Sequence, residues 1–282
     1  MRPKTFALRP RIFYTVNPSD IPQRDPNAKP GEFMDLIPFF DANCMIGRRV
    51  TPRPETNLTT EQIVEEMARL GIGRALVTHA YAKEYDPKTG NARATEACLK
   101  HPAFAPCYVL LPEGTGEMPS GDALLKYLAG GGARAARLYP KEHSYGLGET
   151  WCGGLFGTLE GAGVPALIDF DQTSWPELDG VLRAHPDLNV IVIRTGYRVD
   201  RWIYPMLAKY RGLHLETENY APHMALEAVT ERFGAERLIF GSGVPVWDAG
   251  GAMTHVLYAA VDAAAKRKIA GGNLEKLLWK PH

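Results

Sequence analysis

Short apolar runs alternate with amphipathic segments along most of the chain. Eight of these runs have the length and composition of buried strands, because they are six to eight residues long, rich in aliphatic and aromatic side chains, and bounded by polar residues or glycine. The expected strands span residues 36–42, 74–79, 104–111, 133–139, 165–170, 189–195, 213–218 and 237–242. The regular alternation indicates that a helix follows each strand.

Several residues between these runs are typical of helix starts and helix ends. Ser or Thr followed three residues later by Glu or Gln predicts a capping box, proline suits a first helical position, and glycine suits a helix end. The residues concerned are Thr59 with Gln62, Ser174 with Glu177, Pro222, Gly71 and Gly234. They support helices between the expected strands.

Eight strands separated by helices predict an α/β protein with a (β/α)8 TIM barrel, because each parallel connection needs a crossover and eight such units close the sheet. We expect this barrel to form a single domain over residues 36–282, preceded by an extended N-terminal arm or lid over residues 1–35, where proline is frequent and no hydrophobic period exists. A doubly wound open sheet is the alternative. The GxGxxG signature of dinucleotide binding does not follow any expected strand.

Charge and composition argue against several classes of binding partner. The chain has 282 residues, with 32 Lys and Arg balanced by 32 Asp and Glu. Neither a basic patch for nucleic acid nor a polybasic or long apolar segment for a membrane is present in the sequence. Four cysteines lack CxxC spacing, which predicts reduced thiols in a cytoplasmic protein. We therefore expect a small anionic molecule as substrate or ligand, and the sequence leaves open whether the chain forms a homo-oligomer.

The carboxyl ends of the expected strands hold most of the candidate chemistry, because active sites of TIM barrels lie at this face. Alternation along the strands places four charged residues inward as catalytic candidates: Asp169, Arg194, Glu216 and Glu218. In this assignment Arg194 shares the inward face of its strand with Val192.

Other residues at strand ends and in the connections after them are candidates for substrate binding. They are Asn43, His79, Arg137, Tyr139, His143 and Trp247. A lone histidine at a strand end, such as His79, is also commonly a hydrogen-bonded structural residue. The connection that holds His143 is rich in glycine and is typical either of an ordinary loop or of one that closes over a ligand.

Five segments together resemble the amidohydrolase superfamily, in particular its branch of metal-dependent decarboxylases and lactonases. The segments are DANCMIG (41–47), GVPALIDF (163–170), NVIVIRTGY (189–197), RFGAERLIFGSGVP (232–245) and GGNLEKLL (271–278). Asp41 and Gly47 match the frame of the Asp-x-His-x-His-x-Gly motif with which this branch begins. The resemblance implies a TIM barrel with its catalytic groups at the carboxyl ends of the strands, the mouth of the barrel.

The same resemblance implies that the metal-ligand positions are substituted. The positions of the family's metal ligands hold Asn43, Met45, Asp169, Arg194 and Gly243 in this chain. A catalytic divalent ion needs about three protein ligands, and arginine is a permanent cation. We therefore expect no metal and no other cofactor.

Two hypotheses of different classes follow. The first is a metal-independent hydrolase or decarboxylase for a small carboxylate or carbonyl compound, in which Arg194 binds the carboxylate and Asp169, Glu216 or Glu218 transfers a proton. The second is a non-catalytic pseudoenzyme, retained as a binding or assembly subunit, in which an ion pair of Asp169 with Arg194 fills the mouth.

Overall fold

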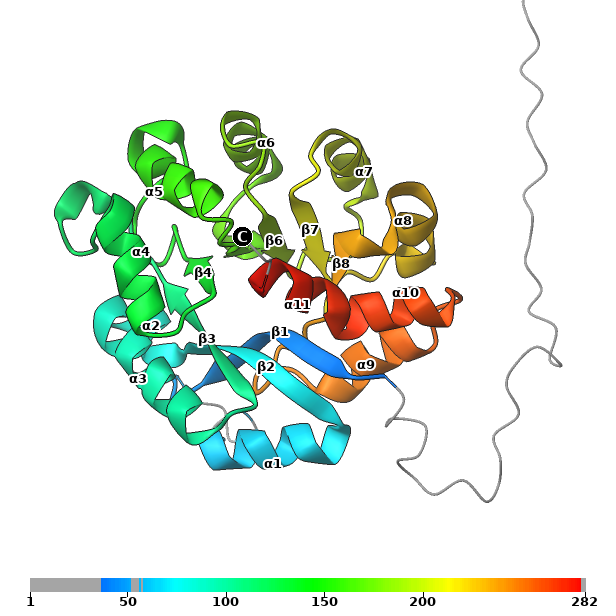
Figure 1. The fold of residues 1–282 in the computed structure, drawn as a ribbon. Helices are drawn as coiled ribbons and strands as arrows, with labels where there is room; N and C mark the ends of the chain where they lie inside the picture. Colours follow the sequence, from blue (N-terminus) through cyan, green and yellow to red (C-terminus); the bar gives the residue numbers. More distant parts are fainter. Residues whose placement is uncertain (1–36, 52–55, 57, 280–282) are drawn as a thin grey trace, which may run out of the picture. The chain divides into compact units, whose positions relative to one another are not determined.

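The computed structural model describes residues 37–51, 56 and 58–279, and within them a barrel of eight parallel strands. Each strand pairs with the next one along the chain, from β1 to β8 (Figure 1). The predicted (β/α)8 barrel is confirmed, and the doubly wound alternative is wrong because the strand order never reverses. The predicted arm, residues 1–35, lies outside the described residues.

All eight expected runs contain a strand. The strands are β1 (Phe39–Ile46), β2 (Ile72–His79), β3 (Phe104–Val109), β4 (Ala135–Leu138), β5 (Ala166–Asp169), β6 (Val190–Ile193), β7 (Leu213–Glu216) and β8 (Leu238–Ile239). Most of their residues are buried, which is what a parallel sheet covered by helices on its outer face requires.

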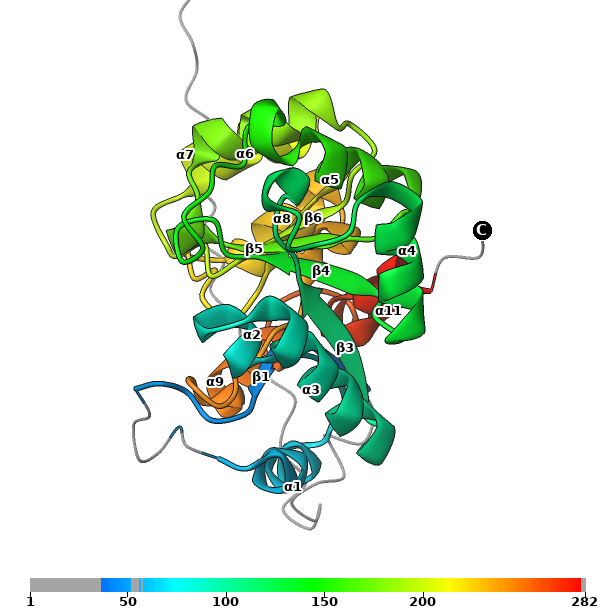
Figure 2. The same cartoon turned by 90° about the vertical axis from the view of Figure 1, so that its left-hand side faces the viewer.

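Helices form a layer around the strands (Figure 2). The α-helices are α1 (Thr60–Leu70), α2 (Ala80–Glu84), α3 (Pro87–Lys100), α4 (Gly121–Gly130), α5 (Glu149–Gly161), α6 (Trp175–Ala184), α7 (Asp200–Lys209), α8 (Ala225–Phe233), α9 (Ala249–Leu257), α10 (Ala263–Arg267) and α11 (Asn273–Leu278). Short helical turns are η2 (Glu113–Thr115), η3 (Phe170–Gln172), η4 (Ala235–Arg237) and η5 (Lys268–Gly272). No helix in the part of the chain that the structure describes is long and apolar enough to cross a membrane.

Most of the helix-boundary predictions are confirmed. Thr59 and Gln62 form a complete capping box at α1, and Gly71 ends this helix in the left-handed region, with φ of 77°. Gly234 ends α8. The prediction for Pro222 is wrong, because α8 begins at Ala225 after a cap at Met224.

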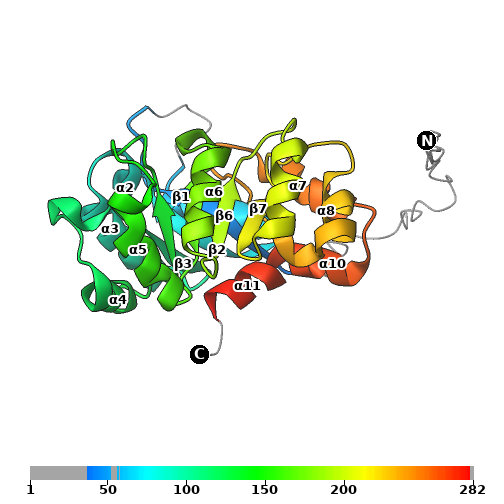
Figure 3. The ribbon, with the colours of Figure 1, turned by 90° about the horizontal axis from the view of Figure 1, so that it is seen from above.

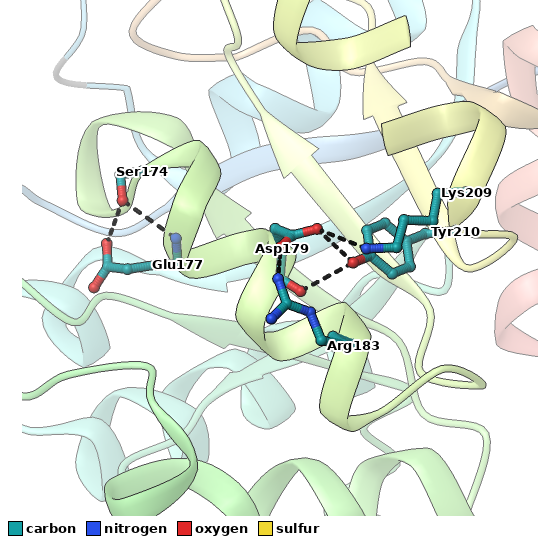
Figure 4. Close-up of polar contacts among 6 residues, drawn as sticks. All are labelled: Ser174, Glu177, Asp179, Arg183, Lys209 and Tyr210. Carbon is teal, nitrogen blue, oxygen red and sulfur yellow. Dashed lines mark hydrogen bonds and ion pairs between the residues drawn. The ribbon is translucent and has the colours of Figure 1, made fainter. Parts of the chain in front are cut away.

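Polar contacts hold α6 to the C-terminal end of α7, as Figure 4 shows. At the start of α6, the Ser174 hydroxyl accepts from the Glu177 N–H and donates to the Glu177 carboxylate. Near the middle of the helix, the Asp179 carboxylate accepts from Tyr210, Arg183 and Lys209. The hydrogen bond from Tyr210, together with those from the two cations, lowers the pKa of Asp179 to about 2. This cluster fixes the spacing of two neighbouring helices on the outside of the barrel.

The interior of the barrel is apolar at its amino-terminal end. Inward side chains from seven strands form a single cluster with three leucines of α11: Phe40, Ala42, Leu76, Ala105, Cys107, Ala135, Leu167, Ile191, Ile193, Ile239, Leu274, Leu277 and Leu278. Helix α11 therefore covers this end, as Figure 1 and Figure 3 show. Because the strands are parallel, their carboxyl ends lie at the opposite end, which we call the mouth.

Closure of the barrel depends on β1 and the residues that follow the short strand β8. Three backbone hydrogen bonds join them: Ala42 N to Phe240 O at 3.0 Å, Gly243 N to Asn43 O at 2.9 Å, and Met45 N to Val244 O at 2.8 Å. The buried Asp41 carboxylate reinforces the same seam, since it accepts from Ser242 N at 2.8 Å, from the Ser242 hydroxyl, and from Asn43 N at 2.8 Å.

We predict that Asp41→Ala destabilises the protein strongly. The substitution leaves three buried donors without an acceptor, at about 1 kcal/mol or more each, so the free energy of unfolding should fall by roughly 3 kcal/mol in equilibrium urea denaturation. Ser242→Ala removes one donor to the carboxylate and the acceptor of the Val244 N–H, but leaves the carboxylate two of its partners, so it should cost less, roughly 1 to 2 kcal/mol. Equal losses in the two variants would contradict the assignment of Asp41 as the central acceptor of this seam.

Candidate functional site

Unpaired polar atoms gather at the mouth of the barrel. Seven buried side-chain nitrogen or oxygen atoms of the described residues have no hydrogen-bond partner, and six of them belong to the ends of β4, β6 and β7 or to the connections that follow. These six are Arg137 Nε, Tyr139 OH, His143 Nδ1, Thr195 Oγ1, Thr217 Oγ1 and Glu218 Oε2. Buried polar groups are rarely left unpaired, so this concentration marks a place where a polar partner fits.

The first cluster at the mouth is a buried ion pair of Arg137 with Asp169. Arg137 points inward from β4 and donates through Nη2 to the Asp169 carboxylate at the end of β5. Burial alone would lower the pKa of Arg137, but the adjacent Asp169 outweighs it and the pKa is raised, so the guanidinium stays charged. We call these two residues the buried pair.

The predicted ion pair of Asp169 with Arg194 is therefore wrong. β5 and β6 are neighbours, as expected, but the residue of β6 opposite Asp169 is Ile193. Ile193 belongs to the barrel core, so Arg194 is not on the inward face that alternation assigned to it. Arg137 occupies the interior instead, opposite Leu167 and therefore two residues below the level of Asp169.

Arg194 reaches the mouth by a local change of backbone direction. It is the first residue after β6 and has φ of 61°, a left-handed conformation that is uncommon for a residue with a side chain. Its guanidinium carbon lies 4.5 Å from the centre of the Trp247 ring, and its Nε lies 3.7 Å from Glu218 Oε2. We call Arg194, Glu218 and Trp247 the Arg194 group.

The arginines of the two clusters differ in their exposure to solvent. The Arg194 side chain is 35% exposed, whereas that of Arg137 is 3% exposed. Among the described residues, the Arg194 side chain forms a long ion pair with Glu218 but no hydrogen bond, so its donors remain available to a ligand. Of the two arginines, only Arg194 is placed to meet a ligand that enters from solvent.

Glu216 holds the Arg194 group from beneath. Its two carboxyl oxygens accept from the backbone N–H of Arg194 at 3.2 Å and of Glu218 at 2.6 Å. The side chain fits there because residue 241 is glycine: a Cβ at this position would lie 2.3 Å from Glu216 Oε1. Burial, with the nearby Glu218 carboxylate contributing further, raises the pKa of Glu216 to about 8.

Glu218 differs from Glu216 in having an edge toward solvent. Its side chain is 11% exposed, and its buried Oε2 accepts no hydrogen bond. Burial raises the pKa of Glu218, while Arg194 acts in the opposite direction. A carboxyl with a raised pKa beside a cation is a suitable group for proton transfer.

Tyr139 and His143 lie beside the buried pair. The Arg137 guanidinium is 5.4 Å from the Tyr139 ring, and burial raises the pKa of Tyr139 well above its usual value, so the phenol is neutral. His143 meets the Tyr139 ring edge-on, with 6.1 Å between ring centres, and its Nε2 lies 2.7 Å from the Lys83 carbonyl oxygen. The connection after β4 thus lies against α2.

His79 and Asn43 have structural contacts. His79 Nδ1 accepts from the Tyr81 N–H at 3.0 Å and caps α2, which places the proton of the neutral ring on Nε2. Burial, together with Arg93, lowers the pKa of His79 to about 4, so the ring is neutral at physiological pH. Asn43 is buried on β1, and its backbone N–H donates to Asp41.

The donor set at the mouth does not fit a catalytic divalent ion. Asp169 already balances Arg137, both oxygens of Asp41 and Glu216 are taken by hydrogen bonds, and Met45 and Gly243 offer no hard donor. Across residues 37–279, apart from those not described, no three His, Cys, Asp or Glu side chains are close enough to share an ion. A permanent guanidinium in the interior adds electrostatic repulsion.

Sequence reasoning missed three contributors to the site. Ser242 is the partner of Asp41, Gly241 makes room for Glu216, and Thr217 leaves a hydroxyl unpaired beside Glu218. The segment GSGVP contains two of them, and its pair of glycines around a serine was the available signal. The four cysteines are free thiols, and burial raises the pKa of Cys44 well above its usual value, which argues against a nucleophilic role.

Comparison with known proteins identifies relatives of the fold. The sequence matches the amidohydrolase family over residues 42–278. Among curated proteins, no significant match was found. An uncharacterised TIM-barrel protein from Bordetella bronchiseptica superimposes with a TM-score of 0.70 at 20% identity, over 86% of this chain and 98% of that chain.

Two further solved structures carry functional names. One is 5-carboxyvanillate decarboxylase from Novosphingobium aromaticivorans, in complex with manganese and 4-hydroxy-3-methoxy-5-nitrobenzoic acid; its TM-score is 0.69 at 14% identity, over 88% of this chain and 97% of that chain. The other is a putative 2-pyrone-4,6-dicarboxylic acid hydrolase from Pseudomonas putida, with a TM-score of 0.64 at 14% identity, over 86% and 97% of the two chains. At these identities the likeness concerns the fold.

We predict that Glu216 makes stability fall as pH rises. Between the ordinary pKa of 4.5 and the raised value of about 8, the unfolded chain releases this proton while the folded chain keeps it. The free energy of unfolding should therefore decrease across this window, by at most about 1.4 kcal/mol per pH unit from this group. Urea denaturation at several pH values between 5 and 8 measures the slope.

The Glu216→Gln variant has no carboxyl at this position, so this part of the slope should disappear. Glu231→Gln is the matched control, because Glu231 is an exposed residue of α8. Identical slopes in the wild type and in Glu216→Gln would show that Glu216 is ionised throughout this pH range.

Proposed function

Because the chain belongs to the amidohydrolase family, we propose that it is a metal-independent enzyme that hydrolyses or decarboxylates a small carboxylate or carbonyl compound at the mouth of its barrel. The observation that carries the proposal is the accessible guanidinium of Arg194. Glu216 holds the backbone N–H of Arg194, and the guanidinium lies against the Trp247 ring and near Glu218, in a side chain that is 35% exposed.

Arginine is suited to bind a carboxylate through two parallel hydrogen bonds. In this role Arg194 anchors the ligand, and the half-exposed Trp247 ring offers an apolar surface for the rest of the molecule. The positive φ of Arg194 supports a functional role, because strained backbone tends to persist at sites where a side chain must be aimed.

Glu218 is the group we assign to proton transfer. Decarboxylation replaces a carboxylate by a proton, so the site needs an anion anchor and an acid; hydrolysis needs a base that activates water. The raised pKa of Glu218 and its contact with Arg194 suit either role. Glu216, named as a catalytic candidate from the sequence, becomes a positioning residue in this proposal, because it is fully buried and both its oxygens hold backbone N–H groups.

The buried pair supplies fixed charge rather than binding. Arg137 remains a cation beneath the ligand and stabilises negative charge that develops above it. Asp169 holds the guanidinium in place, and its side chain is 12% exposed, so one edge faces the mouth. The names of the fold relatives favour an aromatic or cyclic carboxylate as ligand, since one was solved with a hydroxynitrobenzoic acid and another is named for a dicarboxylic acid.

The second candidate function is binding without turnover. The observation in its favour is the buried pair, because two charges that satisfy each other would also fill an inactive mouth. Incubation of the purified protein with 5-carboxyvanillate and with 2-pyrone-4,6-dicarboxylate, followed by chromatography, separates the two functions: a product formed by the wild type supports the enzyme, and binding without any product across a wider panel of carboxylates supports the binding protein.

We predict that Arg194→Met weakens carboxylate binding by roughly 10-fold to 100-fold, which corresponds to the loss of a charge-assisted hydrogen bond. The probe is 4-hydroxy-3-methoxy-5-nitrobenzoate, and isothermal titration measures its affinity. Arg211→Met is the matched control, because Arg211 is an exposed arginine between α7 and β7, away from the mouth. Unchanged affinity in Arg194→Met would remove Arg194 from the site.

We also predict that the purified protein holds no stoichiometric zinc, manganese or iron, because the donor set at the mouth does not fit such an ion. Elemental analysis measures the content directly. Dialysis against a chelator should leave the melting temperature and the affinity for the nitrobenzoate probe unchanged. One tightly held ion per chain, with a lower melting temperature after its removal, would contradict metal independence.

A further inference from the structure

A hollow lies between the connections that follow β6 and β7. Its volume is about 680 Å³, within the range of roughly 300 to 1,000 Å³ that is usual for small-molecule sites. Residues at the start of α7 and just before α8 line it: Tyr197, Arg198, Asp200, Arg201, Tyr204, Pro205, Ala221, Pro222 and His223. None of these residues belongs to the buried pair or to the Arg194 group.

The charges of this hollow favour an anion. Arg198 and Arg201 are both exposed, and neither forms an ion pair with any residue that the structure describes. The single carboxylate in the lining, Asp200, already accepts a hydrogen bond from Tyr220 at 3.0 Å. Two free guanidinium groups against one engaged carboxylate leave a net positive surface, and free guanidinium groups are suited to bind phosphate or carboxylate oxygens.

The walls of the hollow favour a flat ring. Tyr197 is 61% exposed, and the Arg198 guanidinium lies 5.4 Å from its ring centre. Tyr204 lines the same space, where its ring is also held by Phe233, with 5.5 Å between ring centres, and by the Arg232 guanidinium at 4.8 Å; Pro205 and Pro222 add rigid apolar surface. Tyrosine and arginine are the residues most enriched where proteins recognise ligands and partners, because they combine a planar apolar surface with hydrogen-bond donors.

We propose that this hollow is a second binding site, separate from the mouth, for a planar aromatic anion whose phosphate or carboxylate contacts Arg198 and Arg201 and whose ring lies against Tyr197 and Tyr204. The ring and the anionic group are both needed: tyrosine faces bind the ring, and the paired arginines bind the charge. The proposal does not depend on catalysis at the mouth.

Isothermal titration of the full chain with phenyl phosphate tests the site, with inorganic phosphate and phenol as partial ligands. We expect phenyl phosphate to bind at least about tenfold more tightly than either partial ligand, and the Arg198→Met/Arg201→Met variant to weaken it by at least about tenfold. The matched control is Arg211→Met/Arg267→Met, which removes two exposed cations elsewhere and should leave the affinity unchanged.

Other outcomes would overturn the proposal. Binding that is lost in Arg194→Met but kept in Arg198→Met/Arg201→Met would place phenyl phosphate in the mouth. Equal affinity for phenyl phosphate and inorganic phosphate would show a site for anions without recognition of a ring, and no binding at millimolar concentration would show no site. Both substituted arginines are exposed, so the fold should persist; a melting curve verifies this, and the single variants replace the double one if its melting temperature falls.

Because the mouth is tested with a different probe and a different arginine, the two proposals fail separately. Loss of the nitrobenzoate site leaves the phenyl phosphate result standing, and the reverse also holds.

Discussion

The seam between β1 and the residues after β8 is the constraint on which the rest of the structure depends. A barrel exists only when its last strand meets its first, and here β8 has two residues, so the closure passes to the segment that follows it. Three backbone hydrogen bonds and the buried Asp41 carboxylate make this connection. The residues at the mouth, from Asn43 to Trp247, are held by the strands of the closed barrel, and this seam completes that barrel.

The mouth holds two arginines in different environments, one buried in an ion pair and one partly exposed to solvent. The buried pair keeps a cation in the interior at the expense of desolvation, and such pairs are stable only when each partner balances the other. The Arg194 group keeps a second cation partly exposed, with only a long ion pair to Glu218. The first arrangement sets the electrostatic field of the mouth, and the second can recognise a molecule.

The fold was predictable from the sequence, whereas the site was predictable only in part. Buried parallel strands read as continuous apolar runs, so their number and order followed from the pattern, and Asp169 and Glu216 lie on the inward faces that alternation gave them. Arg194 does not, because the inward face of β6 is that of Ile191 and Ile193 rather than that of Val192, and Arg194 lies beyond the last residue of the strand, where its positive φ changes the backbone direction. Alternation holds within a strand and cannot anticipate such a turn. The partner of Asp169 was missed for a related reason: Arg137 and Arg194 both lie at strand ends, and the register that favours Arg137 is a property of the assembled sheet.

Glu216 joins the connections after β6 and β7, which carry the two proposed sites. One carboxyl accepts from the backbone of Arg194 on one connection and from that of Glu218 on the next, so neither connection can shift without disturbing a bond that the other shares. The hollow with Arg198 and Arg201 lies between the same two connections. A ligand that displaces either of them would change affinity at the mouth, and thermodynamic linkage requires the mouth to act back on the hollow with equal strength. The connections after β6 and β7 thus depend on one shared buried side chain for their relative position.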